Sequence, residues 1–77
     1  MKLGKAKEFF HYGLIKSFSA VRRPMASGWI LEIEGVKGSQ WILKKADGEF
    51  REFRSIDSLV ATVETISAGQ LKGFKVL

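Results

Sequence analysis

The chain contains no cysteine, only one histidine and no long apolar run. Without cysteine it can form neither disulfides nor thiolate zinc sites, which are the usual supports of very small domains. The single histidine, His11, cannot build a multi-histidine metal site, and no carboxylate stands at ligand spacing from it. We therefore expect no metal and no cofactor.

The sequence also lacks the features of an exported or membrane protein. No apolar run approaches the ~20 residues of a membrane span, and the N-terminal stretch has no apolar core of a signal peptide. The expectation is a cytoplasmic protein without membrane contact.

Residues that could carry catalysis are few. The serines lack the strand–turn–helix setting of a nucleophile, and Ser55 is better placed to cap a helix. Residues 35–38 hold Lys37 between two glycines, but they lack the Lys-Ser/Thr ending of a P-loop and are typical of a hairpin turn. The sequence predicts a protein that is not an enzyme and has no small-molecule substrate.

A chain of 77 residues is long enough for one domain only, spanning residues 1–77. A domain of this size buries only about 60–65% of the surface that its unfolded chain exposes, so its stability is marginal. Since disulfides and metals are excluded, a very well packed core or a partner chain must supply the remaining stability.

Three segments in the centre of the chain follow strand patterns. Apolar and acidic side chains alternate in 28–34, and further strands follow at 39–45 and 50–53, after turns at 35–38 and 46–48. These segments predict an antiparallel β-meander. A first loop of five residues and a second loop at 46–48 would place Ile33 opposite Trp41, and Trp41 opposite Phe53, with a shift of one residue at either turn as the alternative. One face then collects the expected core: Trp29, Leu31, Ile33, Trp41, Leu43 and Phe53.

A helix is predicted over 56–68. Ser55 is a suitable N-cap, Asp57 complements the helix dipole in the first turn, and Gly69 is the natural stop. Five apolar side chains follow helical spacing and form one stripe: Ile56, Leu59, Val60, Val63 and Ile66.

Three further segments flank this centre. Residues 5–12 are compatible with a short amphipathic helix that ends at Gly13, 14–21 predict a first strand, and 74–77 form either a short final strand or a packed tail. The predicted fold is α+β: a three- to four-stranded antiparallel β-meander packed by one C-terminal helix, with the short N-terminal helix as an option.

The net charge of +5 belongs to the flanks of the chain. Residues 1–23 carry six basic and one acidic side chain, whereas 24–69 carry five basic and seven acidic ones. Basic flanks bind phosphate backbones or acidic protein surfaces, although solubility alone is an equally good interpretation. The sharper hypothesis is DNA binding, with these candidate residues: Lys5, Lys7, Arg22, Arg23, Lys44, Lys45, Arg51 and Arg54.

A single helix covers only one face of the sheet. The other face carries Ile30, Ile42 and Phe50, and burying them in a second copy would stabilise so small a domain. We therefore expect a homodimer. The alternative to DNA binding is a protein-binding adaptor or inhibitor, which uses this face or the basic N-terminal arm on an acidic protein.

A motif in the centre of the chain adds a resemblance. A strand that starts with Gly28-Trp29 and a second strand precede the pattern G-x-x-R-x-F-x-S-x-D, followed by an apolar helix. Over about residues 25–66 the chain resembles small accessory proteins of plasmids and mobile elements, of the ParC-type partition-associated kind. This resemblance implies DNA partition or regulation. Its motif residues are mostly structural: Gly48, Arg51, Phe53, Ser55 and Asp57.

Overall fold

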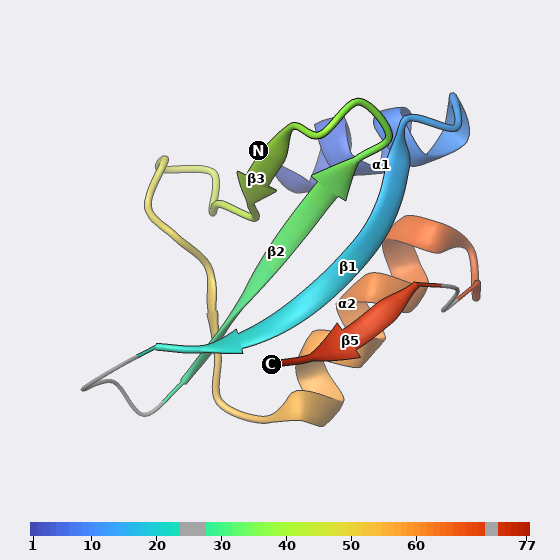
Figure 1. Ribbon diagram of the computed structural model, residues 1–77. Helices are drawn as coiled ribbons and strands as arrows, with labels where there is room; N and C mark the ends of the chain where they lie inside the picture. Colours follow the sequence, from blue (N-terminus) through green and yellow to red (C-terminus); the bar gives the residue numbers. More distant parts are fainter. Residues whose placement is uncertain (24–27, 71–72) are drawn as a thin grey trace.

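The computed structural model describes residues 1–23, 28–70 and 73–77. The elements follow the order α1 (Leu3–His11), β1 (Ile15–Arg22), β2 (Trp29–Gly35), β3 (Gln40–Ile42), β4 (Glu52–Phe53), α2 (Ile56–Ser67) and β5 (Phe74–Val76). They form one mixed sheet, with both helices against the same face (Figure 1). The α+β class is confirmed, and so are the helix at the N-terminus and the short final strand.

The meander is only partly as predicted. β1, β2 and β3 are antiparallel neighbours, and Ile33 opposes Trp41 as expected. Phe53, however, opposes Trp29 on β2 and not Trp41 on β3. The chain leaves the edge of β2 after Leu43, makes a turn, and returns to the same edge as β4. This return pairs backbone groups of β2 that β3 is too short to reach, and it buries Phe53 in the core.

The sheet is mixed because its last strand lies parallel to its first. The strand order is β3-β2-β1-β5, with β4 also on β2. α2 starts where β4 ends and runs back along the sheet, so that it delivers the chain to the beginning of β1 (Figure 1). β5 must then run in the direction of β1, and Phe74 pairs with Phe18. An entirely antiparallel sheet was therefore the wrong expectation, since a parallel pair needs such a crossover.

The core lies between the sheet and the two helices, so the expected single covering helix is corrected to two. α1 contributes Ala6, and α2 contributes three residues of its predicted stripe. Trp29 and Trp41 were expected in the core but are only half-buried and lie at its margin. The buried core consists of Ala6, Phe18, Ala20, Leu31, Ile33, Leu43, Phe53, Leu59, Val63 and Ile66.

The ends of α2 follow the sequence signals closely. The Ser58 N–H donates to the Ser55 hydroxyl at 3.2 Å, which confirms the N-cap. The helix ends one residue before the expected stop, because Ala68 is already left-handed with φ 54°, and Gly69 follows it. Over the described ranges, no helix is long and apolar enough to cross a membrane.

Candidate nucleic-acid interface

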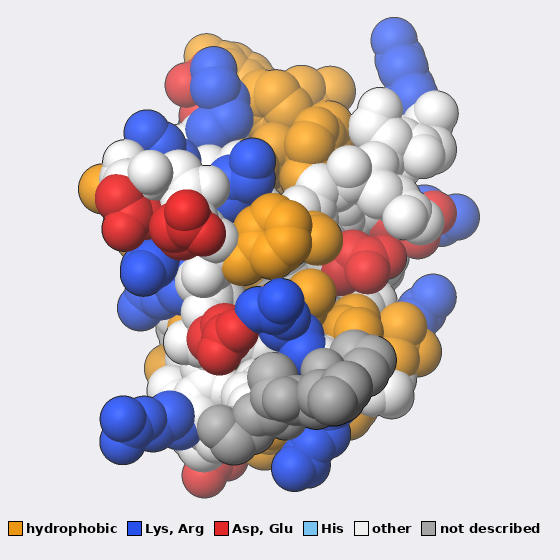
Figure 2. Space-filling view, turned by 90° about the vertical axis from the view of Figure 1, so that its left-hand side faces the viewer, with side chains coloured by type: hydrophobic (Ala, Val, Ile, Leu, Met, Phe, Trp, Pro, Cys, Tyr) orange, Lys and Arg blue, Asp and Glu red, His pale blue; other side chains and the backbone are white. Residues whose placement is uncertain are grey.

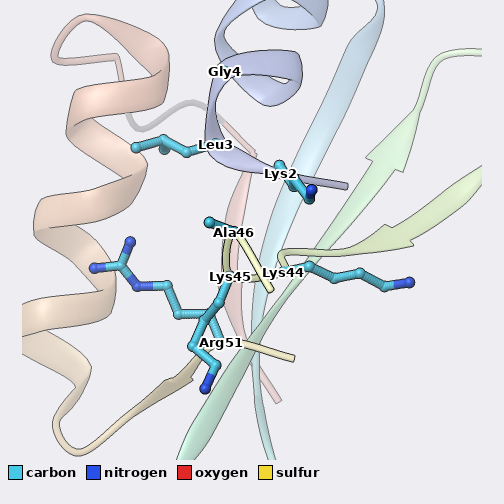
Figure 3. Close-up of a pocket in the computed structure, with 7 residues that line it drawn as sticks. All are labelled: Lys2, Leu3, Gly4, Lys44, Lys45, Ala46 and Arg51. Atoms are coloured by element: carbon cyan, nitrogen blue, oxygen red, sulfur yellow. The ribbon is translucent and has the colours of Figure 1, made fainter. Parts of the chain in front are cut away.

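Four cationic side chains surround one cavity of about 450 Å³ at the edge of the sheet (Figure 3). We call Lys2, Lys44, Lys45 and Arg51 the basic cluster. Leu3, Gly4 and Ala46 complete the lining. The cluster therefore combines the start of α1 with the segment between β3 and β4, which are distant in the sequence.

Backbone pairing brings these two segments together. The Lys44 N–H donates to the Met1 carbonyl at 2.7 Å, and Lys2 forms a parallel bridge with Lys44. The N-terminal amine donates to the Ile42 carbonyl at 2.9 Å. Its pKa is lowered, first by partial burial and then by the positive charges of Lys44 and Lys2. Positive charge is thus concentrated at this edge.

The charged ends of the cluster do not converge on one point. In Figure 3 the Arg51 side chain points toward α2, whereas Lys44 points in the opposite direction. The Arg51 guanidinium lies 5.1 Å from the centre of the Phe53 ring, and the Lys44 ammonium lies 5.9 Å from that of Phe50. Such a spread suits several phosphates along a chain better than a single phosphate.

Most of the basic cluster has no acidic partner among the described residues. Lys45 contacts a carboxylate, that of Asp47 at 3.6 Å. The pKa of Asp47 is lowered, chiefly because the Glu49 N–H donates to its carboxylate at 2.9 Å. In the part of the chain that the structure describes, Lys2, Lys44 and Arg51 have no carboxylate within 4.0 Å. These three cations are available to an external anion.

The other five candidate residues lie elsewhere. On α1, Lys5 stands 4.0 Å from Glu8, and Lys7 lines a hollow with residues of α2. Arg22 stacks over Trp29 at the end of β1. The last two complete the set: Arg23 forms an ion pair with Glu52, and Arg54 is exposed between β4 and α2.

The structure thus gathers three of the eight candidates, together with Lys2, which belongs to the basic N-terminal segment but is not one of the eight. Lys44, Lys45 and Arg51 flank one local turn, so their proximity follows from the hairpin signal at 46–48. Lys2 joins them only through pairing across more than 40 residues, for which the sequence carries no local signal.

The uncovered face of the sheet mixes acidic and apolar side chains, as the alternation of the strands predicts. Strand pairing places Glu32, Glu34 and Glu52 on it, and the Ser17 hydroxyl donates to Glu34 at 3.1 Å. Of its expected apolar residues, Ile30 is buried and Phe50 is 41% exposed. Figure 2, which looks onto the side where β3 and residues 44–51 lie, shows Lys and Arg side chains with carboxylates between them. Positive charge therefore gathers at the basic cluster, whereas the open face carries three carboxylates.

Residues 1–23, 28–70 and 73–77 contain no group of three His, Asp or Glu side chains that could hold a metal ion. No protein-family model, curated protein or solved structure matches this chain.

Proposed function

We propose that the protein is a cytoplasmic, non-catalytic accessory protein of a plasmid or mobile element that binds the phosphate backbone of DNA. The observation that carries this proposal is the basic cluster, in which four cations share one cavity and three of them have no acidic partner among the described residues. Neutralising phosphates with such side chains releases condensed counterions, which drives binding regardless of base sequence. The resemblance to partition-associated proteins points to the same partner.

The proposal predicts a salt-dependent affinity that the double variant Lys44→Gln/Arg51→Gln weakens. Each phosphate contact adds about 0.9 to the slope of log affinity against log salt on duplex DNA, and about 0.7 on single strands. Losing two contacts should lower that slope by roughly 1.4–1.8. Fluorescence anisotropy with labelled single- and double-stranded oligonucleotides over a salt series measures it.

The matched control is the double variant Lys16→Gln/Lys75→Gln. It removes the same charge from exposed positions on β1 and β5, and β5 lies at the opposite edge of the sheet from β3. It should retain the wild-type slope. An equal effect of both double variants would mean that only net charge matters. Absence of any binding at low salt would reject DNA as the partner and leave an acidic protein as the ligand of the basic cluster.

We also propose a homodimer that forms through the uncovered face, where Phe50 is exposed between the Arg23 and Lys44 side chains. Sedimentation equilibrium should give twice the chain mass of 8.6 kDa. Phe50→Ser should shift the equilibrium to the monomer, because it removes the largest exposed apolar side chain of this face. Tyr12→Ser, a similar loss beyond the end of α1, should not. A wild-type monomer at every concentration would refute the dimer.

A further inference from the structure

A second hollow, separate from the basic cluster, lies where α1 ends, β1 begins and the β2–β3 turn passes. It has a volume of about 240 Å³ and a mainly apolar lining. We call it the aromatic groove. Its lining residues are Phe9, Leu14, Gly35, Val36, Lys37, Ser39 and Trp41.

The aromatic rings of this groove are held in place before any ligand binds. The Phe9 and Trp41 rings meet edge to face, with centroids 5.4 Å apart and an interplanar angle of 77°. The Trp41 ring packs directly against Gly35. A Cβ added at Gly35 would stand only 2.8 Å from the nearest carbon of that ring. Only glycine permits this close approach. The groove therefore offers a preorganised aromatic wall.

The opposite wall is apolar and open to solvent. Leu14 and Val36 are both exposed, Val36 to 52%, and the Val36 N–H donates to the Leu14 carbonyl at 3.0 Å. This backbone contact fixes the two side chains beside the aromatic rings. Exposed apolar side chains around a hollow are typical of a binding site.

The charge around the groove favours an anionic ligand. Lys37 belongs to the lining, and the Lys5 ammonium, which also stands 4.0 Å from the Glu8 carboxylate, lies 5.7 Å from the centre of the Phe9 ring. None of the described lining residues is a carboxylate. Trp41 also precedes Lys44 of the basic cluster by three residues, or roughly 10 Å of extended chain. An anionic chain bound at one site can thus reach the other.

We propose that the aromatic groove binds one unpaired base of single-stranded DNA, whose neighbouring phosphates contact the basic cluster. This inference rests on the proposed function and specifies the form of DNA. The groove is far larger than a water molecule, at about 30 Å³, but smaller than the roughly 300–1,000 Å³ of sites for larger ligands, so it suits one planar ring system. A base within a duplex is paired and stacked and cannot enter, whereas an unpaired base stacks readily on aromatic side chains.

The test variant is Val36→Glu, which adds a carboxylate to the lining of the groove at a turn position that is 52% exposed. Its affinity for an oligothymidine of about 12 nucleotides, within the site sizes of single-strand binders, should fall roughly 5- to 150-fold, the range expected for losing one stacked base. Its affinity for duplex DNA should change much less. The matched control, Val76→Glu, makes the same substitution at 56% exposure on β5 and should leave both affinities near the wild type.

A second measurement observes the groove directly. In a Trp29→Phe background, Trp41 is the only tryptophan, and its fluorescence should be quenched by oligothymidine but not by an abasic strand of the same length. Equal affinity for abasic and normal strands, with no quenching, would overturn the inference. The proposed function would survive that result if Lys44→Gln/Arg51→Gln still weakened binding. Absence of binding to every nucleic acid would reject both, and specific binding of an acidic apolar peptide would assign the groove to a protein.

Discussion

Replacing Phe18 with alanine is expected to lower the free energy of unfolding by about 3–5 kcal/mol. Phe18 is 1% exposed on the central strand β1, and its ring lies 6.2 Å from that of Phe10 on α1. Alanine would leave a cavity between the sheet and the helices. A typical domain has only ~0.05–0.15 kcal/mol of stability per residue, so a chain this short would lose much of its total. Urea unfolding followed by circular dichroism measures the loss.

The control for Phe18 is Tyr12→Ala. Tyr12 is also aromatic but is 67% exposed, beyond the end of α1. Its removal should cost less than about 0.5 kcal/mol, as surface substitutions generally do. Comparable losses for the two variants would show that the core is not organised around Phe18.

The second large effect is expected for Gly73→Ala, which should lower the free energy of unfolding by about 2–4 kcal/mol. Gly73 has φ 81°, where a side chain is strained by roughly 1–2 kcal/mol, and its added Cβ would stand 2.8 Å from the Lys16 carbonyl oxygen. The clash is with backbone, so β1 or β5 must move. The Leu77 N–H, which donates to the Ala20 carbonyl at 2.8 Å, should then lose its protection from hydrogen exchange.

Gly69→Ala separates the two causes of this loss. Gly69 has φ 88°, but nothing lies within 4 Å of an added Cβ. Gly69→Ala should therefore lower the free energy of unfolding by the conformational strain alone, about 1–2 kcal/mol. The Leu77 N–H should keep its protection from hydrogen exchange. If Gly69→Ala and Gly73→Ala lowered the free energy of unfolding equally, the close approach of Gly73 to β1 would not contribute to the loss.

The candidate site could be predicted from the sequence only where it is local. Lys44, Lys45 and Arg51 flank a turn whose glycine, Gly48, has φ 91° as the hairpin signal requires. Lys2 belongs to the same cavity because residues 1–2 pair with the segment after β3. The aromatic groove was missed because the sequence predicts Trp41 as a core residue and gives residues 5–12 only as a short amphipathic helix. The contact between the half-buried Phe9 and Trp41 rings depends on where α1 packs against the sheet.

The sequence by itself determined α2, β1, β2 and the turns, because a capping serine, turn glycines and apolar periodicity act over a few residues. The strands predicted over 39–45 and 50–53 are shortened to β3 and β4. Ser55, Gly48 and the stripe of α2 all behave as their local chemistry requires. Only the tertiary structure decided how these elements pair. Phe53 could have opposed Trp41 or Trp29 with equally good alternation, and the choice of Trp29 followed from burying Phe53 while pairing the remaining edge of β2. The parallel docking of β5, the basic cluster and the aromatic groove all depend on such contacts between distant segments.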